Sequence, residues 1–392
     1  MKVLIYRYGS ICEPDIISGL NYLGFDTIEC TKEMEDKSLK PAVAAKIVSG
    51  IIMENKFDFC FSINFFPWLS DICQLLNLKY ICLIVDSPVL ELYSDSIKNP
   101  VNKIFLFDLE LFNSFNKYNP ANIFHIPLFA NTRRIDDLIK NTSKEVKEKY
   151  KSDISFIGST YEEKNIYTSK EMSDYNRGFH DSIVEAQSRI SGVNLLYDLI
   201  DKNFTDEFLK KSQGKLFLPK DSSNGDAKAL VSDAYLSYRA SFLERHRILF
   251  ELSKEFNVDL YTASNISNLP NVNYRGRART LTEMPLIFNM SKINLNITSK
   301  AIKSGIPLRL FDSLGSGGFT LTNYQRELLV LFEDGKDLVC YEDIDHLKEL
   351  CSYYLSHEEE RLIIAKNGHD KVAKYHNVST RLLQIIDIAF KW

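Results

Sequence analysis

The sequence lacks the short motifs that assign several large enzyme classes. It has no G-x-x-x-x-G-K-[ST] loop, which argues against a Walker-type ATPase. No G-x-G-x-x-G follows the first predicted strand, where Gly9 stands alone, and this argues against an NAD enzyme. H-E-x-x-H is also absent and the seven histidines are scattered, so we interpret the histidines as core or surface residues.

Paired cysteines and long apolar runs are missing too. The seven cysteines contain no C-x-x-C pair, and most of them fall in apolar segments. We therefore expect reduced core thiols in a cytoplasmic protein, with a zinc site as the alternative. The first residues do not resemble a signal peptide, and no run approaches the roughly 20 apolar residues of a membrane helix. We expect no transmembrane segment.

The chain has no excess of positive charge. Its net charge of -4 argues against general nucleic-acid binding, so no nucleic-acid partner is expected. A composition of 45% hydrophobic and 26% charged residues is ordinary for a globular enzyme. A length of 392 residues exceeds one simple core and predicts two domains.

What the first half does contain is an alternation of short apolar strands with amphipathic helices. Strands are predicted at residues 3–6, 25–29, 57–63, 80–85, 104–107 and 123–126. Continuously apolar strands separated by helices indicate a parallel sheet covered on both faces, so the fold class is α/β and doubly wound. We assign residues 1–135 to this domain, and the charged stretch 136–150 to a linker.

The pattern restarts at the segment DISFIG, residues 153–158, and predicts a second domain over 151–376. Further strands are predicted at residues 258–261, 272–274, 319–321 and 338–341, with a strong amphipathic helix at 241–256. The polar stretch of about 161–240 has little strand character and is predicted as a helical insertion. Residues 377–392 form a last apolar helix.

Residues 284–324 are the most informative segment, with the predicted order helix, buried strand, long loop, helix, strand. The loop and the next helix bring together Lys300, Lys303, Ser304, Gly305, Arg309 and Asp312. Positive charge and small residues at a helix N-terminus favour an anion, because free N–H groups and the helix dipole point there. The acidic residue one turn deeper can accept hydrogen bonds from ribose. The alternative is a solvated loop with an ordinary Arg–Asp pair.

Asp86 is the second candidate position. It follows the most apolar strand of the first domain, in the turn Asp86-Ser87-Pro88. A carboxylate at the carboxyl edge of a parallel sheet lies where a general base or a sugar-binding group is needed. The alternative is a turn-forming aspartate that caps the next helix.

Several of these segments resemble the CgeB-type (spore-maturation-protein-like) glycosyltransferases. The second half is similar to their donor domain through SKINLNIT, GIPLRLFDSLGSGGFTLTNY, DISFIGSTYEEK and YYLSHEEERLIIAKNGHDKVAKYHNVSTR. The first half is similar through FSINFFPWLSDICQLLNLKY, VDSP and NKIFLFD. The resemblance implies the GT-B fold, in which two Rossmann-like domains face each other across a cleft. It also implies that the last helix packs back on the first domain.

The resemblance implies transfer of a sugar, hexosyl-like, from a nucleotide-diphosphate sugar to a hydroxyl-bearing acceptor. The donor is expected to be a UDP-sugar, and the acceptor a protein, a glycan or a small molecule. No cofactor and no metal are expected, because fixed positive charge stabilises the leaving diphosphate. In place of a D-x-D metal motif the chain has Ser94-Asp95-Ser96. The alternative is a non-catalytic protein of the same fold that binds a nucleotide sugar or a glycan.

The site residues implied by the resemblance lie mostly in the second domain. For the nucleotide sugar they are Gly158, Lys164, Lys303, Ser304, Gly305, Arg309 and Asp312; the catalytic residue is Asp86, followed by Asp108 and Glu13. The chain departs from larger relatives at two places. Their E-x7-E pair is replaced by Ser304 and Asp312, and the position of their first-loop arginine holds Ser159. Arg309 is expected to supply the missing charge, and retention or inversion stays open.

Overall fold

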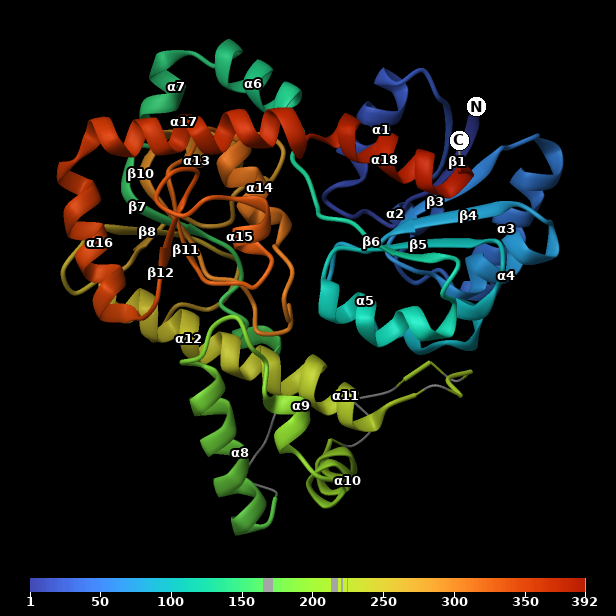
Figure 1. The fold of residues 1–392 in the computed structure, drawn as a ribbon, viewed down its shortest axis with the longest axis horizontal. Helices are drawn as coiled ribbons and strands as arrows, with labels where there is room; N and C mark the ends of the chain where they lie inside the picture. The colour runs from blue at the N-terminus through green and yellow to red at the C-terminus, as the bar shows by residue number, and fades with distance from the viewer. Residues whose placement is uncertain (165–171, 213–217, 220, 224, 392) are drawn as a thin grey trace. The chain divides into compact units, whose positions relative to one another are not determined.

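Two six-stranded, wholly parallel β-sheets organise the chain in a computed structural model (Figure 1). The structure describes residues 1–164, 172–212, 218–219, 221–223 and 225–391. Contacts divide the chain into two compact units. Unit 1 comprises Met1–Asn131, Leu218–Asp226 and Asn377–Trp392, and unit 2 comprises Thr132–Phe217 and Ala227–His376.

Unit 1 alternates strands and helices along its length. Its elements are β1 (Lys2–Tyr6), α1 (Glu13–Tyr22), β2 (Asp26–Cys30), α2 (Lys32–Glu35), α3 (Pro41–Glu54), β3 (Phe59–Ile63), α4 (Pro67–Leu75), β4 (Lys79–Leu83), η1 (Leu90–Tyr93), η2 (Asp95–Lys98), β5 (Asn102–Leu106), α5 (Leu109–Phe115), η3 (Asn116–Tyr118), β6 (Ile123–His125) and α18 (Val378–Phe390). The strand order is β2-β1-β3-β4-β5-β6. The order therefore reverses between β1 and β3, which is the point where ligands bind in such sheets.

Apolar residues cover both faces of the unit 1 sheet, because helices pack on each side. Every residue of β3 is buried, and α3 and α4 add Val48, Leu69 and Cys73 to one core. The last helix, α18, packs beside α1, as Figure 1 shows. A Cβ added at Gly19 in α1 would lie 2.6 Å from Leu382 Cδ1 in α18, so glycine allows this close approach.

Unit 2 contains the second sheet and a helical insertion. Its elements are α6 (Thr132–Asn141), α7 (Lys144–Glu148), β7 (Ser152–Ile157), η4 (Glu162–Lys164), α8 (Asp174–Gln187), α9 (Leu196–Leu199), α10 (Lys202–Lys211), α11 (Ala227–Val231), the π-helical turn η6 (Ser232–Leu236), α12 (Ser237–Leu252), β8 (Val258–Tyr261), β9 (Asn273–Tyr274), α13 (Met284–Met290), β10 (Ser291–Asn296), α14 (Leu308–Gly315), β11 (Thr320–Asn323), α15 (Leu328–Leu331), β12 (Val339–Tyr341), α16 (Ile344–Ser356) and α17 (Glu358–Tyr375). The strand order β12-β11-β10-β7-β8-β9 reverses between β7 and β10.

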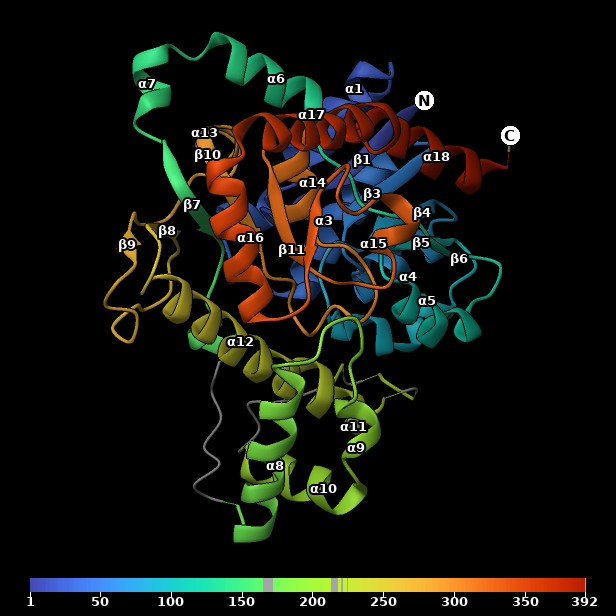
Figure 2. The same cartoon turned by 60° about the vertical axis from the view of Figure 1, so that its left-hand side comes forward.

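The insertion of unit 2 has an apolar core of its own. Its helices α8 to α10 extend away from α12 as a separate lobe in both views of the chain (Figure 2). Ile183, Leu196, Phe204 and Phe208 are buried within it and meet Leu236 of η6. Because this stretch is mostly polar, its buried apolar residues are hard to recognise from the sequence.

The predicted alternation of strands and helices is confirmed in both halves, and the order helix, strand, loop, helix, strand holds across residues 284–324. Several strands are a residue or two shorter than predicted. β4 is one of them: it ends at Leu83, although the apolar run continues to Val85. The ladder stops because the Val85 N–H donates to the Asn64 side chain at 3.1 Å rather than to a neighbouring strand.

The charged stretch after the first sheet is mostly helical. Much of it forms α6 and α7, and α6 buries Thr132 and Ile135 within unit 2. All seven cysteines are free thiols. No described helix is long and apolar enough to cross a membrane.

Candidate active site

The carboxyl edge of the unit 2 sheet holds a buried arginine at the point where the strand order reverses. Arg245 lies on α12 and donates through Nη1 to the Ser159 carbonyl at 2.6 Å, just beyond β7. Its Nε donates to the Ile297 carbonyl at 3.1 Å, just beyond β10. The guanidinium thus spans the two strands between which ligands of open α/β sheets bind.

A second arginine from the predicted anion loop lies beside it. Arg309 is in the first turn of α14, half-buried, with Nη1 2.8 Å from the Met284 sulfur. Burial, and then the charge of Arg245, lower the pKa of Arg309, while Asp312 opposes the change. Among the residues that the structure describes, no carboxylate forms an ion pair with either guanidinium. Both guanidinium groups at this edge are therefore without an ion-pair partner in the described part of the chain, although Glu162, Glu163 and Asp312 lie nearby.

The loop after β7 completes this cationic edge. The Tyr161 ring lies 4.4 Å from the Arg245 guanidinium carbon, with the Tyr161 backbone in the left-handed region at φ 66°. Lys164 is exposed and lies 4.2 Å from the Tyr238 ring centroid. A Cβ added at Gly158 would lie 3.7 Å from Arg245 Nη1. Gly158, Lys164 and Arg309 of the predicted set thus gather around Arg245.

Buried polar atoms without partners mark the same edge. Within the described chain, Thr160 Oγ1, Asn323 Nδ2 and Gln325 Oε1 make no hydrogen bond. Thr160 follows β7, and Asn323 ends β11 and accepts from the Thr298 N–H at 2.8 Å beyond β10. Buried polar groups are normally satisfied, so this edge is shaped for a ligand or ordered water.

Two other members of the predicted set are engaged elsewhere. Lys303 forms an ion pair with Asp233 of η6 at 2.9 Å, and Ser304 donates to Glu327 at 2.8 Å. Lys300 forms a buried ion pair with Glu244 at 2.8 Å. These contacts hold the loop of residues 297–307 against the rest of unit 2, and they neutralise the charges of Lys300 and Lys303.

The remaining predicted residues lie at the end of this loop and in the helix that follows it. Gly305 is buried just before α14. The N-cap of that helix is Pro307, which offers no side-chain acceptor to the first-turn N–H groups. Asp312 is buried one turn into α14. It lies close enough to Arg309 for its charge to oppose the lowering of the Arg309 pKa. The start of α14 therefore has no side-chain cap beside Arg309.

Unit 1 places Asp86 at the carboxyl edge of its own sheet. Asp86 is exposed after β4 and accepts from Asn64 Nδ2 at 2.7 Å. The next helix, η1, has Val89 as its N-cap, and no helical N–H of the described residues binds Asp86, so the capping alternative does not describe it. The capping role belongs to Asp108, which is buried and accepts from the Leu111 N–H at 3.0 Å. Glu13 is buried as well and accepts backbone N–H groups of the first loop.

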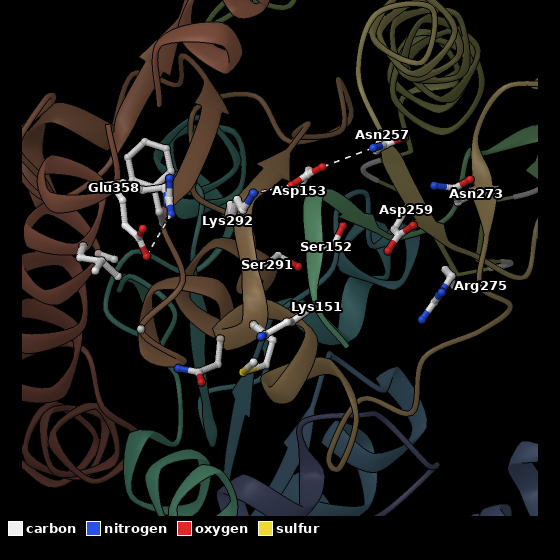
Figure 3. Close-up of a pocket in the computed structure, with 17 residues that line it drawn as sticks. Lys151, Ser152, Asp153, Asn257, Asp259, Asn273, Arg275, Ser291, Lys292 and Glu358 are labelled. Atoms are coloured by element: carbon white, nitrogen blue, oxygen red, sulfur yellow. Dashed lines mark hydrogen bonds and ion pairs between the residues drawn. The ribbon is translucent and has the colours of Figure 1, made fainter. Parts of the chain in front are cut away.

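A groove of about 750 Å³ lies at the opposite, amino edge of the unit 2 sheet (Figure 3). Ser152 and Ser291, the first residues of β7 and β10, line it. Asp153 pairs there with Lys292 at 2.7 Å and accepts from Asn257 at 3.4 Å, as the dashed lines show. Its charges are largely paired, and it lies away from the edge where such sheets bind ligands.

No group of three or more His, Cys, Asp or Glu among the described residues is arranged to hold a metal ion. The chemistry available at the unit 2 edge is thus that of two guanidinium groups, an exposed ammonium and backbone N–H groups. Such an edge suits a diphosphate, because guanidinium groups match phosphate oxygens in shape and charge. Arg245 was not found from the sequence. It lies in an amphipathic helix, and the apolar pattern of that helix does not predict which strand ends the Arg245 side chain contacts.

Residues 240–387 match the family model "Glycosyl transferase-like". This segment contains α12, the anion loop and α14, and therefore both arginines. No curated protein matches the sequence.

Solved glycosyltransferase structures share the fold over the whole chain. A glycosyltransferase from Rickettsia africae matches at a TM-score of 0.54 and 13% identity, covering 100% of this chain and 98% of that one. Anabaena HepE in complex with UDP-glucose matches at 0.56 and 10% identity, covering 100% of each chain. T4 phage BGT in complex with its UDP-glucose substrate matches at 0.51 and 10% identity, also covering 100% of each. The predicted α/β class is confirmed: the chain has the fold of GT-B glycosyltransferases, and residues 240–387 are similar to the glycosyl transferase-like family.

Proposed function

We propose that the chain is a glycosyltransferase that moves a hexosyl group from a UDP-sugar to a hydroxyl-bearing acceptor, and that it belongs to the CgeB type. The glycosyl transferase-like match of residues 240–387 supports the reaction class. HepE and BGT, which share the fold, are solved with UDP-glucose, and this supports a UDP-hexose as donor. The seven unpaired cysteines support a cytoplasmic location.

The observation on which the proposal rests is the pair Arg245 and Arg309. Arg245 is buried and Arg309 is half-buried, and neither forms an ion pair with a described carboxylate. Burial lowers the pKa of Arg309 although Asp312 lies near it, so the lost hydration is costly unless an anion binds. A nucleoside diphosphate supplies two adjacent negatively charged phosphate groups, one for each guanidinium. As the sugar leaves, charge builds on the diphosphate, and fixed guanidinium groups stabilise it without a metal ion or another cofactor.

The other residues of the unit 2 edge have supporting roles in this proposal. The Gly158 loop lets the diphosphate approach β7, with Lys164 as a further cation. Lys303, Ser304 and Gly305 shape the loop before α14, whose free N–H groups face the phosphates. Asp312 accepts the ribose hydroxyls.

For the acceptor we propose Asp86 as the acting carboxylate. The acceptor oxygen forms a bond to the anomeric carbon of the sugar while the bond from that carbon to the diphosphate oxygen breaks. The diphosphate leaves with the electron pair, and the hydroxyl proton passes to a carboxylate. Asp86 fits this role because one of its oxygens is held by Asn64 and its side chain is exposed.

The alternative is a non-catalytic protein that binds a nucleotide sugar. One observation favours it: Lys300 and Lys303 are both neutralised by Glu244 and Asp233, which removes two charges from the diphosphate site. The alternative shares the donor site and predicts binding without turnover.

An assay of nucleoside-diphosphate release separates the two. The protein is incubated with UDP-glucose, UDP-galactose, UDP-N-acetylglucosamine and GDP-mannose, each with and without EDTA. The proposal predicts release of UDP from at least one UDP-sugar, unaffected by EDTA and lost in Arg309→Ala. Binding of UDP without release from any sugar would favour the non-catalytic alternative, and neither binding nor release would overturn both.

A further inference from the structure

The carboxyl edge of the unit 1 sheet is built quite differently from that of unit 2. Its strand order reverses between β1 and β3, so the loops after these two strands form its binding position. In many α/β proteins the first loop binds phosphate through its backbone N–H groups. Here the chain's own Glu13 occupies them, accepting from the N–H groups of Tyr8 at 2.9 Å, Gly9 at 3.0 Å and Ser10 at 3.0 Å.

Acidic side chains make this edge unfavourable for an anion. Glu13 is buried, and its one cationic partner, Arg7 at 3.1 Å, is shared with Glu29. The exposed Asp86 carboxylate lies close enough to act on Tyr8: burial, and then Asp86, raise the pKa of the Tyr8 phenol. Lys37 reaches the same loop and donates to the Tyr8 carbonyl, but the carboxylates outnumber the cations, so the edge favours a neutral ligand over a phosphate-bearing one.

Three half-buried aromatic rings stand at the same place. Tyr8 follows β1, Phe66 follows β3, and Trp68 is in the first turn of α4. The ring centroids of Tyr8 and Phe66 are 5.4 Å apart, and those of Phe66 and Trp68 are 6.2 Å apart. Both pairs meet edge to face, at interplanar angles of 62° and 65°, so the three half-buried residues together form a non-planar apolar platform.

A fixed polar pair borders this platform. Asn64 is held in the left-handed region at φ 56°, and its Oδ1 accepts from the Val85 N–H at 3.1 Å. Its Nδ2 donates to Asp86 at 2.7 Å and to the Tyr8 hydroxyl at 3.0 Å. Asn64 therefore ties the aromatic platform to the carboxylate, and it leaves Asp86 able to accept another hydrogen bond.

We infer that this edge of unit 1 binds a neutral pyranose, so the acceptor in the proposed reaction is a saccharide rather than a peptide or a phosphorylated compound. A pyranose has one face of C–H groups, which packs on Tyr8, Phe66 and Trp68. Its hydroxyl groups donate to Asp86. That this saccharide is the acceptor rests on the proposed function, but saccharide binding by this edge does not depend on it.

The two tryptophans of the chain, Trp68 and Trp392, permit a direct test. In the full-length Trp392→Phe protein, fluorescence reports Trp68 alone. The probes are methyl glucoside, maltose, cellobiose, lactose and chitobiose, with glucose 6-phosphate and a short Ser/Thr peptide for comparison. We expect a saturable change with at least one neutral saccharide at millimolar concentration, and a weaker one or none with glucose 6-phosphate and the peptide.

Matched variants in the same background locate the site. Phe66→Ala should weaken saccharide binding by about tenfold, the equivalent of one lost ring contact of some 1.4 kcal/mol. Asp86→Asn, at an exposed position, should also weaken it and is not expected to affect folding. Tyr22→Ala removes an aromatic that is 61% exposed at the other edge of the sheet and should change nothing.

Three results would overturn the inference: no change with any neutral saccharide, saturation by the peptide or by glucose 6-phosphate in preference to sugars, or unchanged affinity in both Phe66→Ala and Asp86→Asn. UDP binding is measured on the same samples by calorimetry. Bound UDP without saccharide binding refutes this inference alone, whereas saccharide binding without UDP binding or release refutes the proposed transfer and leaves the saccharide site standing.

Discussion

Single side chains decide the proposed chemistry, and Arg309 is the most informative of them. Replacing Arg309 by Ala removes one of two fixed charges that stabilise the leaving diphosphate. We expect UDP release to fall by roughly 10²-fold, as for loss of one transition-state donor. Folding should be kept, because Arg309 is only half-buried and its removal ends an unfavourable desolvation of charge. Steady-state kinetics and a melting curve test this.

The matched control is Arg279→Ala, because Arg279 is an exposed arginine of unit 2 that pairs with Glu283 at 3.0 Å. It should retain wild-type turnover. If Arg309→Ala also kept wild-type turnover, Arg309 would not belong to the donor site.

Asp86 gives the second prediction at this scale. Asp86→Asn keeps the shape and the contact with Asn64 but removes the base. Turnover should fall strongly while UDP affinity stays nearly unchanged, since the nucleotide contacts are assigned to unit 2. The control is Asp95→Asn, at a partly exposed carboxylate paired with Lys98. Equal loss of UDP affinity and turnover in Asp86→Asn would contradict the assignment.

The sequence indicated some of these residues and missed others, for a physical reason. Asp86 and Arg309 stand at ends of strongly patterned elements, where parallel-sheet rules locate a site. Arg245 is missed because its role comes from carbonyls just beyond β7 and β10, far from it in the chain. Lys300 and Lys303 seemed free because their partners, Glu244 and Asp233, lie 56 and 70 residues earlier in the chain.

At the scale of elements, the contact of α18 with α1 gives a stability prediction. Gly19→Val would place its Cβ 2.6 Å from Leu382 Cδ1 and 3.1 Å from Val378 Cγ2. Overpacking of this kind costs about 1–3 kcal/mol of unfolding free energy. Denaturant unfolding should show this loss, and Leu382→Ala in the Gly19→Val background should recover part of it.

Gly50 supplies the control for that experiment. It lies within α3, with nothing within 4 Å of an added Cβ. Gly50→Ala should therefore raise the unfolding free energy by about 0.5–1 kcal/mol. If Gly19→Val is as stable as the wild type, the close approach of α18 to α1 is not what holds this helix.

Elements were predictable where apolar periodicity is strong and not where it is weak. All six strands of the first sheet were expected within about two residues, because buried parallel strands are continuously apolar. The short helices α2 and α5 were not expected, since four and seven residues are too few to show a helical period. The small core of the insertion was not predicted because its buried residues are spread over a polar stretch.

At the scale of the whole molecule, the two sheets have opposite characters at their carboxyl edges. The unit 2 edge presents Arg245, Arg309 and Lys164, whereas the unit 1 edge presents Asp86 and an internally bound Glu13. Length and alternation predicted two doubly wound domains from the sequence. The difference between the edges could not be predicted, because it depends on which side chains fill each loop.

The most direct test of the central claim is a calorimetric titration of the full chain with UDP in magnesium-free buffer containing EDTA. The proposed cationic edge predicts one binding site per chain, an affinity at least tenfold weaker in Arg309→Ala, and unchanged affinity in Arg279→Ala. Absence of UDP binding by the wild type, or equal affinity in Arg309→Ala, would contradict a nucleotide-sugar donor site at the carboxyl edge of unit 2.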